Sequence, residues 1–214
     1  MAKKRIRRAM SVDNVMQSKY KTLPFEGKWK DGIGCPEITG SWVIMGPPKN
    51  GKTSFAMMLS KYLTNFLNGA YNSIEEGNSL SIQEAMKRVS MDEVSGKLVF
   101  LDKMPIEEME EWLKMRNSPD FVVIDSIQFA DMTWVQYKRL KECFTDKIFI
   151  FISHIEGRQP EGSVAKRIYK DANVTFMVEG FRAFPRGRYG GGASIDVSEE
   201  LADAHWGLKR MLEE

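Results

Sequence analysis

The stretch GPPKNGKT, residues 46–53, decides the fold. An apolar run, Ser41–Met45, precedes it, and a segment with a helical apolar stripe, Lys52–Leu67, follows it. Its two glycines allow backbone angles and a close approach that other residues do not. Such a loop, placed between a strand and the start of a helix, presents backbone N–H groups and the positive end of a helix dipole to an anion. The stretch therefore predicts a phosphate-binding loop.

The eight residues match the nucleotide-binding P-loop pattern, G-x-x-x-x-G-K-[ST], in full. In that pattern Lys52 reaches the β- and γ-phosphates, and the hydroxyl of Thr53 is a ligand of Mg²⁺. We therefore expect ATP and Mg²⁺ to bind here. The expected nucleotide contacts are Gly46, Pro47, Pro48, Lys49, Asn50, Gly51, Lys52, Thr53 and Ser54. The alternative, a chance match at a glycine-rich turn, does not explain why a strand and a helix flank the pattern.

Strand-like and helix-like segments alternate after the P-loop. Two of them, Phe121–Ile124 and Ile148–Ile152, are continuous apolar runs, as expected for strands buried on both faces of a parallel sheet. The alternation predicts an α/β fold, with a mainly parallel central sheet flanked by helices and right-handed crossovers. Near the C-terminus, Val174–Val178 and Phe181–Phe184 predict terminal antiparallel strands.

Composition bounds the organisation of the chain. Its 214 residues suit one compact domain, and a net charge of +2 does not make it a polyelectrolyte. We expect residues 1–38 to form a basic N-terminal arm and linker, and residues 39–214 to form one ATPase domain. No apolar run has spanning length, no signal-peptide pattern is present, and Cys35 and Cys143 fit no metal or disulfide pattern. These features predict a cytoplasmic protein without a membrane partner.

A P-loop site also needs a carboxylate at the end of a neighbouring strand. Asp125 directly follows the run Phe121–Ile124 and is the expected second group for Mg²⁺, acting through water. Its alternative role is that of a helix cap or turn residue. In many P-loop ATPases a catalytic glutamate follows this aspartate, but here Ser126 follows, so the glutamate must come from another segment.

Two acidic residues, Glu75 and Glu76, end the strand predicted over Ala70–Ile74. We expect Glu75 rather than Glu76 to orient the attacking water; the alternative is that both are solvated loop charges. His154 lies just after the strand predicted over Ile148–Ile152. A polar residue there can contact the γ-phosphate or its water, although a purely structural histidine remains the alternative.

The segments GPPKNGKT, YNSIEEG, FVVIDSIQ, FISH and RGRYG occur in the order of the RecA-like ATPase core. Within it, the chain resembles the RadA/Sms and DnaB-type branch, over residues 39–190. The resemblance implies that Glu75 is the catalytic glutamate, that His154 is the sensor residue, and that the segment 156–163 is a mobile loop that responds to DNA. The size of the chain and its lysine-rich start are similar to those of small ATPases of phages and prophages.

The resemblance also implies an assembly. Arg186-Gly187-Arg188 is similar to the K-x-R finger of DnaB-type proteins and to the KNRFG element of RadA, whose basic side chains reach the γ-phosphate of a neighbouring subunit. We therefore expect a homo-oligomer, as a ring or a filament, in which Arg186 or Arg188 acts on the adjacent site. The segment Leu23–Gly34 either docks on the next subunit, as in RecA-like assemblies, or packs on its own domain.

Single-stranded DNA is the partner that this resemblance favours, because the segments after the sensor and after Asp125 face the channel in RecA-like rings. The candidate contacts there are Arg158, Lys166, Arg167, Phe129 and Trp134. We expect an ATP-driven factor in DNA recombination or replication, with a replication or recombination protein as a second candidate partner. The alternatives are a nucleotide-dependent switch or assembly ATPase whose partner is a protein, and a small-molecule kinase. The IDSIQ segment and the lack of an arginine-rich lid insertion argue against the kinase.

Overall fold

The computed structural model describes residues 9–213 of the chain, with side chains as far as Leu208. The first eight residues, with the basic set Lys3, Lys4, Arg5, Arg7 and Arg8, lie outside this range. The strands are β1 (Gly40–Met45), β2 (Gly69–Ser73), β3 (Leu98–Asp102), β4 (Phe121–Asp125), β5 (Ile148–Ser153), β6 (Ile155–Glu156), β7 (Gln159–Pro160), β8 (Val174–Glu179), β9 (Arg182–Gly187) and β10 (Ile195–Asp196). The α-helices are α1 (Val12–Met16), α2 (Gly27–Ile33), α3 (Lys52–Leu63), α4 (Leu80–Arg88), α5 (Ile106–Leu113), α6 (Trp134–Cys143), α7 (Ser163–Asp171) and α8 (Glu199–Glu213), and a 3-10 helix, η1, spans Met91–Val94.

The P-loop strand β1 lies inside an eight-stranded sheet of order β10-β9-β8-β1-β5-β4-β2-β3. The six strands from β8 to β3 run parallel to their neighbours, and β9 and β10 add an antiparallel edge. This confirms the predicted α/β class, including the terminal antiparallel strands. Because β5 lies between β1 and β4, the strand that leads to His154 separates the P-loop strand from the strand that ends at Asp125.

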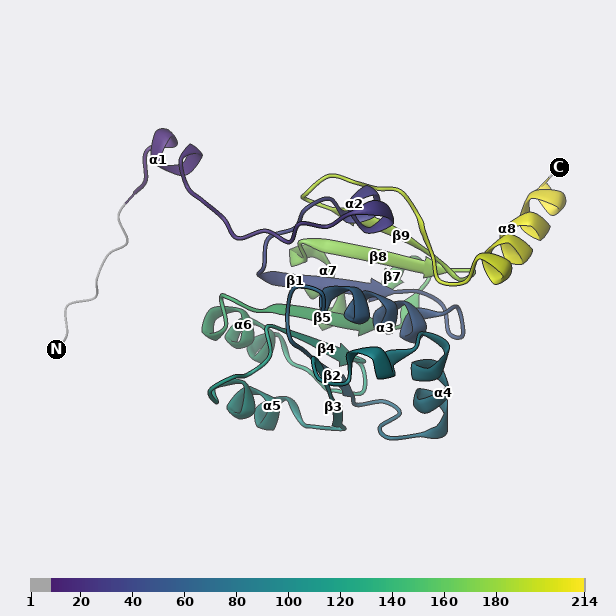
Figure 1. Ribbon diagram of the computed structural model, residues 1–214, viewed down its shortest axis with the longest axis horizontal. Helices are drawn as coiled ribbons and strands as arrows, with labels where there is room; N and C mark the ends of the chain where they lie inside the picture. The colour runs from purple at the N-terminus through teal and green to yellow at the C-terminus, as the bar shows by residue number, and fades with distance from the viewer. Residues whose placement is uncertain (1–8, 214) are drawn as a thin grey trace.

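Helices cover the sheet in two layers (Figure 1). Helices α2, α3 and α4 cover one face, called here the α3 face, where their apolar side chains pack with Trp42 and Ile44 of β1. Helices α5, α6 and α7 cover the other, the α7 face, where they pack with Val43 and Met45. Successive residues of β1 therefore contribute to opposite layers. Apart from Ser41, which accepts a hydrogen bond from the Tyr137 hydroxyl at 3.0 Å, the buried side chains of this strand are apolar.

The segment before β1 belongs to the core of its own domain. Leu23, Phe25, Trp29 and Ile33 are buried in the same cluster as the α3 face. The indole of Trp29 stacks on the ring of Tyr62 in α3, with centroids 5.0 Å apart and planes 15° apart. Of the two alternatives for this segment, the structure shows packing on its own domain; the boundary at residue 38 stays a prediction.

Two helices, α1 and α8, extend from the body of the molecule (Figure 1). Helix α1 begins after Ser11, whose Oγ accepts a hydrogen bond from the Asn14 N–H, and it contains no buried residue. Helix α8 leaves the antiparallel edge of the sheet, and the indole of its Trp206 packs edge-on against Phe184 of β9, at 5.4 Å. Within residues 9–213, no helix combines the length and apolar composition that a bilayer crossing requires.

Candidate nucleotide site

The two P-loop glycines are needed for different reasons. Gly51 has a φ of +94°, a left-handed conformation that side chains disfavour, and it is the N-cap of α3. A Cβ at Gly46 would lie 2.0 Å from the carbonyl oxygen of Val178, so β8 leaves no room for a side chain there. Gly51 offers no side chain to cap the helix, so the N-terminus of α3 is open to an anionic ligand.

A second segment holds the P-loop in place. The turn between β8 and β9 meets it at Asn50, whose Oδ1 accepts a hydrogen bond from the Gly180 N–H at 2.7 Å. The Phe181 N–H donates to the Asn50 carbonyl at 3.3 Å, and the Phe181 ring lies against Gly51. These contacts join residues about 130 positions apart, and the P-loop pattern alone does not predict them.

Lys52 is nearly fully buried, and its Nζ donates a hydrogen bond to the Pro47 carbonyl at 2.9 Å. Burial lowers the pKa of Lys52, while the negative charges of Asp125 and Glu75 act in the opposite direction. The ammonium group therefore lies within the electrostatic reach of both carboxylates and inside the loop that the sequence assigns to the phosphates.

Asp125 is buried at the end of β4, and its Oδ2 accepts a hydrogen bond from the Tyr71 hydroxyl at 2.6 Å. Burial raises the pKa of Asp125 to about 6; the charges of Glu75 and Glu76 add to the rise, while the Tyr71 hydrogen bond and Lys52 oppose it. A bound cation would favour the ionised form of this carboxylate.

The residues around Asp125 fit a hydrated metal ion. Ser73 ends β2 directly opposite Asp125 in the parallel register, so the two side chains share the α3 face. The Ser73 Oγ is buried and has no hydrogen-bond partner in the described part of the chain. An unsatisfied buried hydroxyl is costly, and a metal-bound water would satisfy it. Thr53, Asp125 and Ser73 thus offer the oxygen ligands that Mg²⁺ prefers.

The structure brings Glu75 and His154 into direct contact. The Nε2 of His154 lies 3.0 Å from Oε2 of Glu75, and the Ser126 hydroxyl donates to the same oxygen at 3.1 Å. Both the Ile74 and Glu75 N–H groups donate to the Asp125 carbonyl, at 2.7 and 2.9 Å, which fixes the end of β2 to the end of β4. Glu76 is exposed and accepts a hydrogen bond from Ser81 instead, so Glu75 is the glutamate that contacts His154.

Gln128, to which the sequence assigned no role, joins three segments around His154. Its Oε1 accepts a hydrogen bond from the His154 N–H at 3.2 Å. Its Nε2 donates to Ser153 Oγ and to the Glu161 carbonyl, both at 2.9 Å. The only sequence signal was its place three residues after Asp125, in the IDSIQ segment.

The predicted loop 156–163 contains a two-stranded hairpin of β6 and β7. The hairpin turns at Gly157, which has a φ of +63°, and it closes where the Glu161 N–H donates to the His154 carbonyl at 2.9 Å. We refer to residues 155–160 as the sensor hairpin. Its base is thus hydrogen-bonded to both His154 and Gln128.

The candidate arginines lie away from the P-loop of their own chain. Strand β9 runs antiparallel to β8, so Arg186 pairs with Thr175, and the Arg188 N–H donates to the carbonyl of Asn173, just before β8. Both arginines are exposed. The structure therefore does not bring them to the nucleotide site of the same chain, while it does bring together Lys52, Asp125, Glu75 and His154.

The candidate DNA contacts differ in their surroundings. Phe129 is 55% exposed and its ring lies 6.2 Å from the ring of His154. The Arg167 guanidinium lies 4.0 Å above the centroid of the Trp134 ring, and Lys166 pairs with Glu156 at 3.5 Å. Arg158 lies on the sensor hairpin and is exposed.

No protein-family model matches the chain, and neither does any curated protein. Among solved structures, the crystal structure of the flagellar accessory protein FlaH from Methanocaldococcus jannaschii is similar, with a TM-score of 0.57 and 17% identical residues. The match covers 84% of this chain and 96% of that one. At this identity the similarity supports the fold alone, which is RecA-like.

Proposed function

We propose that this chain is a RecA-like ATPase that hydrolyses ATP and converts the loss of the γ-phosphate into a movement of the sensor hairpin. The observation that carries the proposal is the contact of Glu75 with both Ser126 and His154, next to the P-loop lysine. A carboxylate held in this way is ready to act on water, and the histidine beside it continues into the hairpin.

These contacts support the following roles for the side chains. Lys52 exchanges its hydrogen bond with Pro47 for one with the phosphates. Among the described residues, both contacts of the Glu75 carboxylate fall on Oε2, so Oε1 is available to orient and deprotonate the attacking water. Thr53 and Asp125 would hold Mg²⁺, which would supply charge neutralisation to the phosphates of ATP.

His154 links Glu75 to the sensor hairpin. Its side chain touches Glu75, and its backbone is bonded to Gln128 and Glu161. A change in the hydrogen bond between His154 and Glu75 on hydrolysis therefore acts directly on the base of the sensor hairpin. Such a local two-state contact is the kind of element through which nucleotide state alters a distant surface.

We propose further that the chain belongs near the RadA/Sms and DnaB-type branch, assembles as a ring or filament, and acts on single-stranded DNA in recombination or replication. The exposed arginines at the far end of β9 support the assembly, because they can reach a neighbouring subunit but not their own nucleotide. The exposed ring of Phe129 and the arginine of the sensor hairpin, Arg158, support a DNA-facing surface.

The second candidate is an assembly ATPase whose partner is a protein. The observation that favours it is the similarity to FlaH, which is titled a flagellar accessory protein. Both candidates use the same nucleotide chemistry, and they differ in what the sensor hairpin contacts.

Steady-state ATP hydrolysis with and without single-stranded DNA separates the two, with Lys52→Ala as the blank. A several-fold rise with DNA supports the DNA-directed function, whereas Lys52-dependent turnover without a rise supports the protein-directed one. Turnover no higher than that of Lys52→Ala would remove ATP hydrolysis from the proposal.

A mixing experiment tests the arginine in trans. Arg188→Ala subunits mixed with Lys52→Ala subunits should regain activity, because the Lys52→Ala subunit supplies Arg188 to the intact P-loop of the Arg188→Ala subunit. Absence of rescue argues against action in trans.

A further inference from the structure

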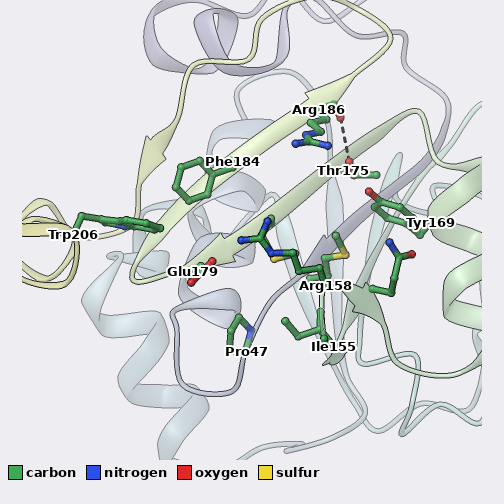
Figure 2. Close-up of a pocket in the computed structure, with 13 residues that line it drawn as sticks. Pro47, Ile155, Arg158, Tyr169, Thr175, Glu179, Phe184, Arg186 and Trp206 are labelled. Carbon is green, nitrogen blue, oxygen red and sulfur yellow. Dashed lines mark hydrogen bonds between the residues drawn. The ribbon is translucent and has the colours of Figure 1, made fainter. Parts of the chain in front are cut away.

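A pocket of about 620 Å³ lies on the α7 face of β8 and β9, lined on its sides by Tyr169 of α7 and Trp206 of α8 (Figure 2). Its floor is formed by side chains of these two strands, among them Thr175, Met177 and Phe184. The sensor hairpin forms one wall and α8 another, and the P-loop contributes only Pro47. Lys52, Thr53, Asp125 and Glu75 do not line it, so the pocket adjoins the nucleotide site only at Pro47.

Two guanidinium groups line this pocket. Arg158 comes from the sensor hairpin and Arg186 from β9, and Figure 2 shows both beside the same hollow. Within the described part of the chain, neither arginine has a carboxylate within ion-pair distance, and Glu179 is the single acidic residue of the lining. Guanidinium groups bind phosphate with paired N–H donors, so the charge of the pocket suits a phosphate.

Aromatic side chains supply the second feature. Phe184 and Trp206 meet edge-to-face at 5.4 Å on one side of the pocket, and Tyr169 of α7 stands on another (Figure 2). Phosphate-binding arginines beside aromatic rings are the combination that recognises a nucleotide, because any base can stack on a ring. The volume lies in the range of small-ligand pockets.

We propose that this pocket binds one nucleotide unit, with its phosphate on Arg158 and Arg186 and its base against the wall of Phe184 and Trp206. The source of that unit is either a single strand of nucleic acid or a free nucleotide. The strand is the expected source if the chain acts on DNA, and in that respect the inference rests on the proposed function. The placement of Arg186 in the pocket leaves Arg188 as the residue for the trans role.

The pocket is coupled to the ATP site by its walls. Arg158 lies on the hairpin whose base is bonded to His154 and Gln128, and Pro47 accepts the hydrogen bond of Lys52. A ligand in the pocket therefore contacts groups that change when the P-loop fills. By thermodynamic linkage, a nucleotide in the P-loop changes the affinity of the pocket for its ligand by a certain factor. The ligand in the pocket then changes the affinity of the P-loop for that nucleotide by the same factor.

The test uses the full chain with its P-loop saturated by ADP and Mg²⁺, so that added nucleotides report only on the pocket. Fluorescein-labelled oligothymidylate and thymidine monophosphate are titrated against the wild type, Arg158→Gln and Arg186→Gln. Arg116→Gln is the matched control, because Arg116 is an exposed arginine between α5 and β4, outside the pocket lining. Each pocket variant should weaken binding about tenfold, and the control by less than about twofold.

Each outcome has a distinct meaning. Loss of oligothymidylate binding in the pocket variants, when the monophosphate does not bind, supports the strand as source. The slope of log K against log salt concentration should then become shallower by about 0.7 for each lost phosphate contact. Monophosphate binding that needs the same arginines supports a free nucleotide. Wild-type affinity of both pocket variants for both probes overturns the inference.

The same samples keep this inference apart from the proposed function. Arg116→Gln, which lies outside the pocket, should retain the Lys52-dependent basal turnover. If turnover persists and DNA still stimulates it while the pocket variants bind normally, the pocket fails and the proposed function stands. If the wild type shows no Lys52-dependent turnover, the proposed function fails whatever the binding data show.

Discussion

The P-loop strand β1 has β5 on one side and β8 on the other, and the two sides offer different chemistry. On the β5 side, the acid–base side chains are bonded to one another: Asp125 to Tyr71, and Glu75 to Ser126 and His154. On the β8 side, Arg158 and Arg186 line an open pocket. Side chains held by hydrogen bonds to one another suit a reaction that needs fixed geometry, whereas exposed arginines suit a ligand that arrives from solution.

The largest effect is expected from removing the proposed base, Glu75, on the β5 side. Glu75→Gln keeps the shape of the side chain but cannot accept a proton, so turnover should fall about 100-fold or more while ATP binding persists. Glu76→Gln, the neighbouring exposed glutamate, is the control and should hydrolyse at nearly the parent rate. A Glu75→Gln variant that retains parent turnover would remove Glu75 from the mechanism.

The second test concerns stability and pH on the same side. The pKa of Asp125 is raised to about 6 by burial, above its value of about 4 in an unfolded chain. Between these values the folded protein binds more protons than the unfolded chain, so ionisation of Asp125 reduces stability as the pH rises through this window.

Asp125→Asn removes the free-energy cost of burying an ionised carboxylate at this position. Urea unfolding of the nucleotide-free protein should show a gain of up to about 3 kcal/mol at pH 7, which shrinks toward zero near pH 4. Binding of Mg²⁺ with nucleotide should be weakened in the same variant. A gain that does not change with pH would mean that the buried charge is not its origin.

The third test asks whether the two sides communicate. Gln128→Leu removes the side-chain hydrogen bonds that join Ser153 and His154 to Glu161 at the base of the sensor hairpin, and keeps the backbone bond of Glu161 to His154. Basal turnover should fall by no more than about threefold, while stimulation by a bound strand or partner should be strongly reduced, because the side-chain link is broken and Glu75 is retained. Gln83→Leu, an exposed glutamine of α4, is the control; equal stimulation in the two variants would place the coupling elsewhere.

The smallest expected effect comes from the β8 side of the P-loop. Asn50→Ala removes the acceptor of the Gly180 N–H and loosens the loop, so the Kd for ATP should rise about fivefold. Calorimetric titration measures it, with Asn65→Ala, an exposed residue after α3, as the reference. If both variants bind ATP equally well, the β8–β9 turn does not support the P-loop.

Much of the fold followed from local patterns. The continuous apolar runs at β4 and β5 identified buried parallel strands, and the P-loop pattern fixed the strand and helix around it. Because parallel strands bring their C-terminal ends to one edge, residues that follow β2, β4 and β5 were expected near the phosphates. The contact of Glu75 with His154 agrees with that expectation.

Other features depend on contacts between distant segments, which a local pattern does not encode. Tyr71 looks like an ordinary residue of a buried strand, yet its hydroxyl holds Asp125. The strands of the sensor hairpin have two residues each, too short for a periodic signal. The segment before β1 is interrupted by glycine and proline, which favoured a linker, although four of its apolar side chains are buried.

That buried segment has a practical consequence for shortening the protein. Phe25 and Trp29 both contact Tyr62, and the Glu26 N–H donates to the Tyr62 hydroxyl at 2.9 Å. Deleting residues 1–38 would expose the apolar surface of α3 beneath them. Each large apolar side chain is worth about 1.5–3 kcal/mol of burial, and a typical domain is stable by only about 5–15 kcal/mol. A shortened form that begins before Leu23 should fold, whereas one that begins at the P-loop strand should aggregate.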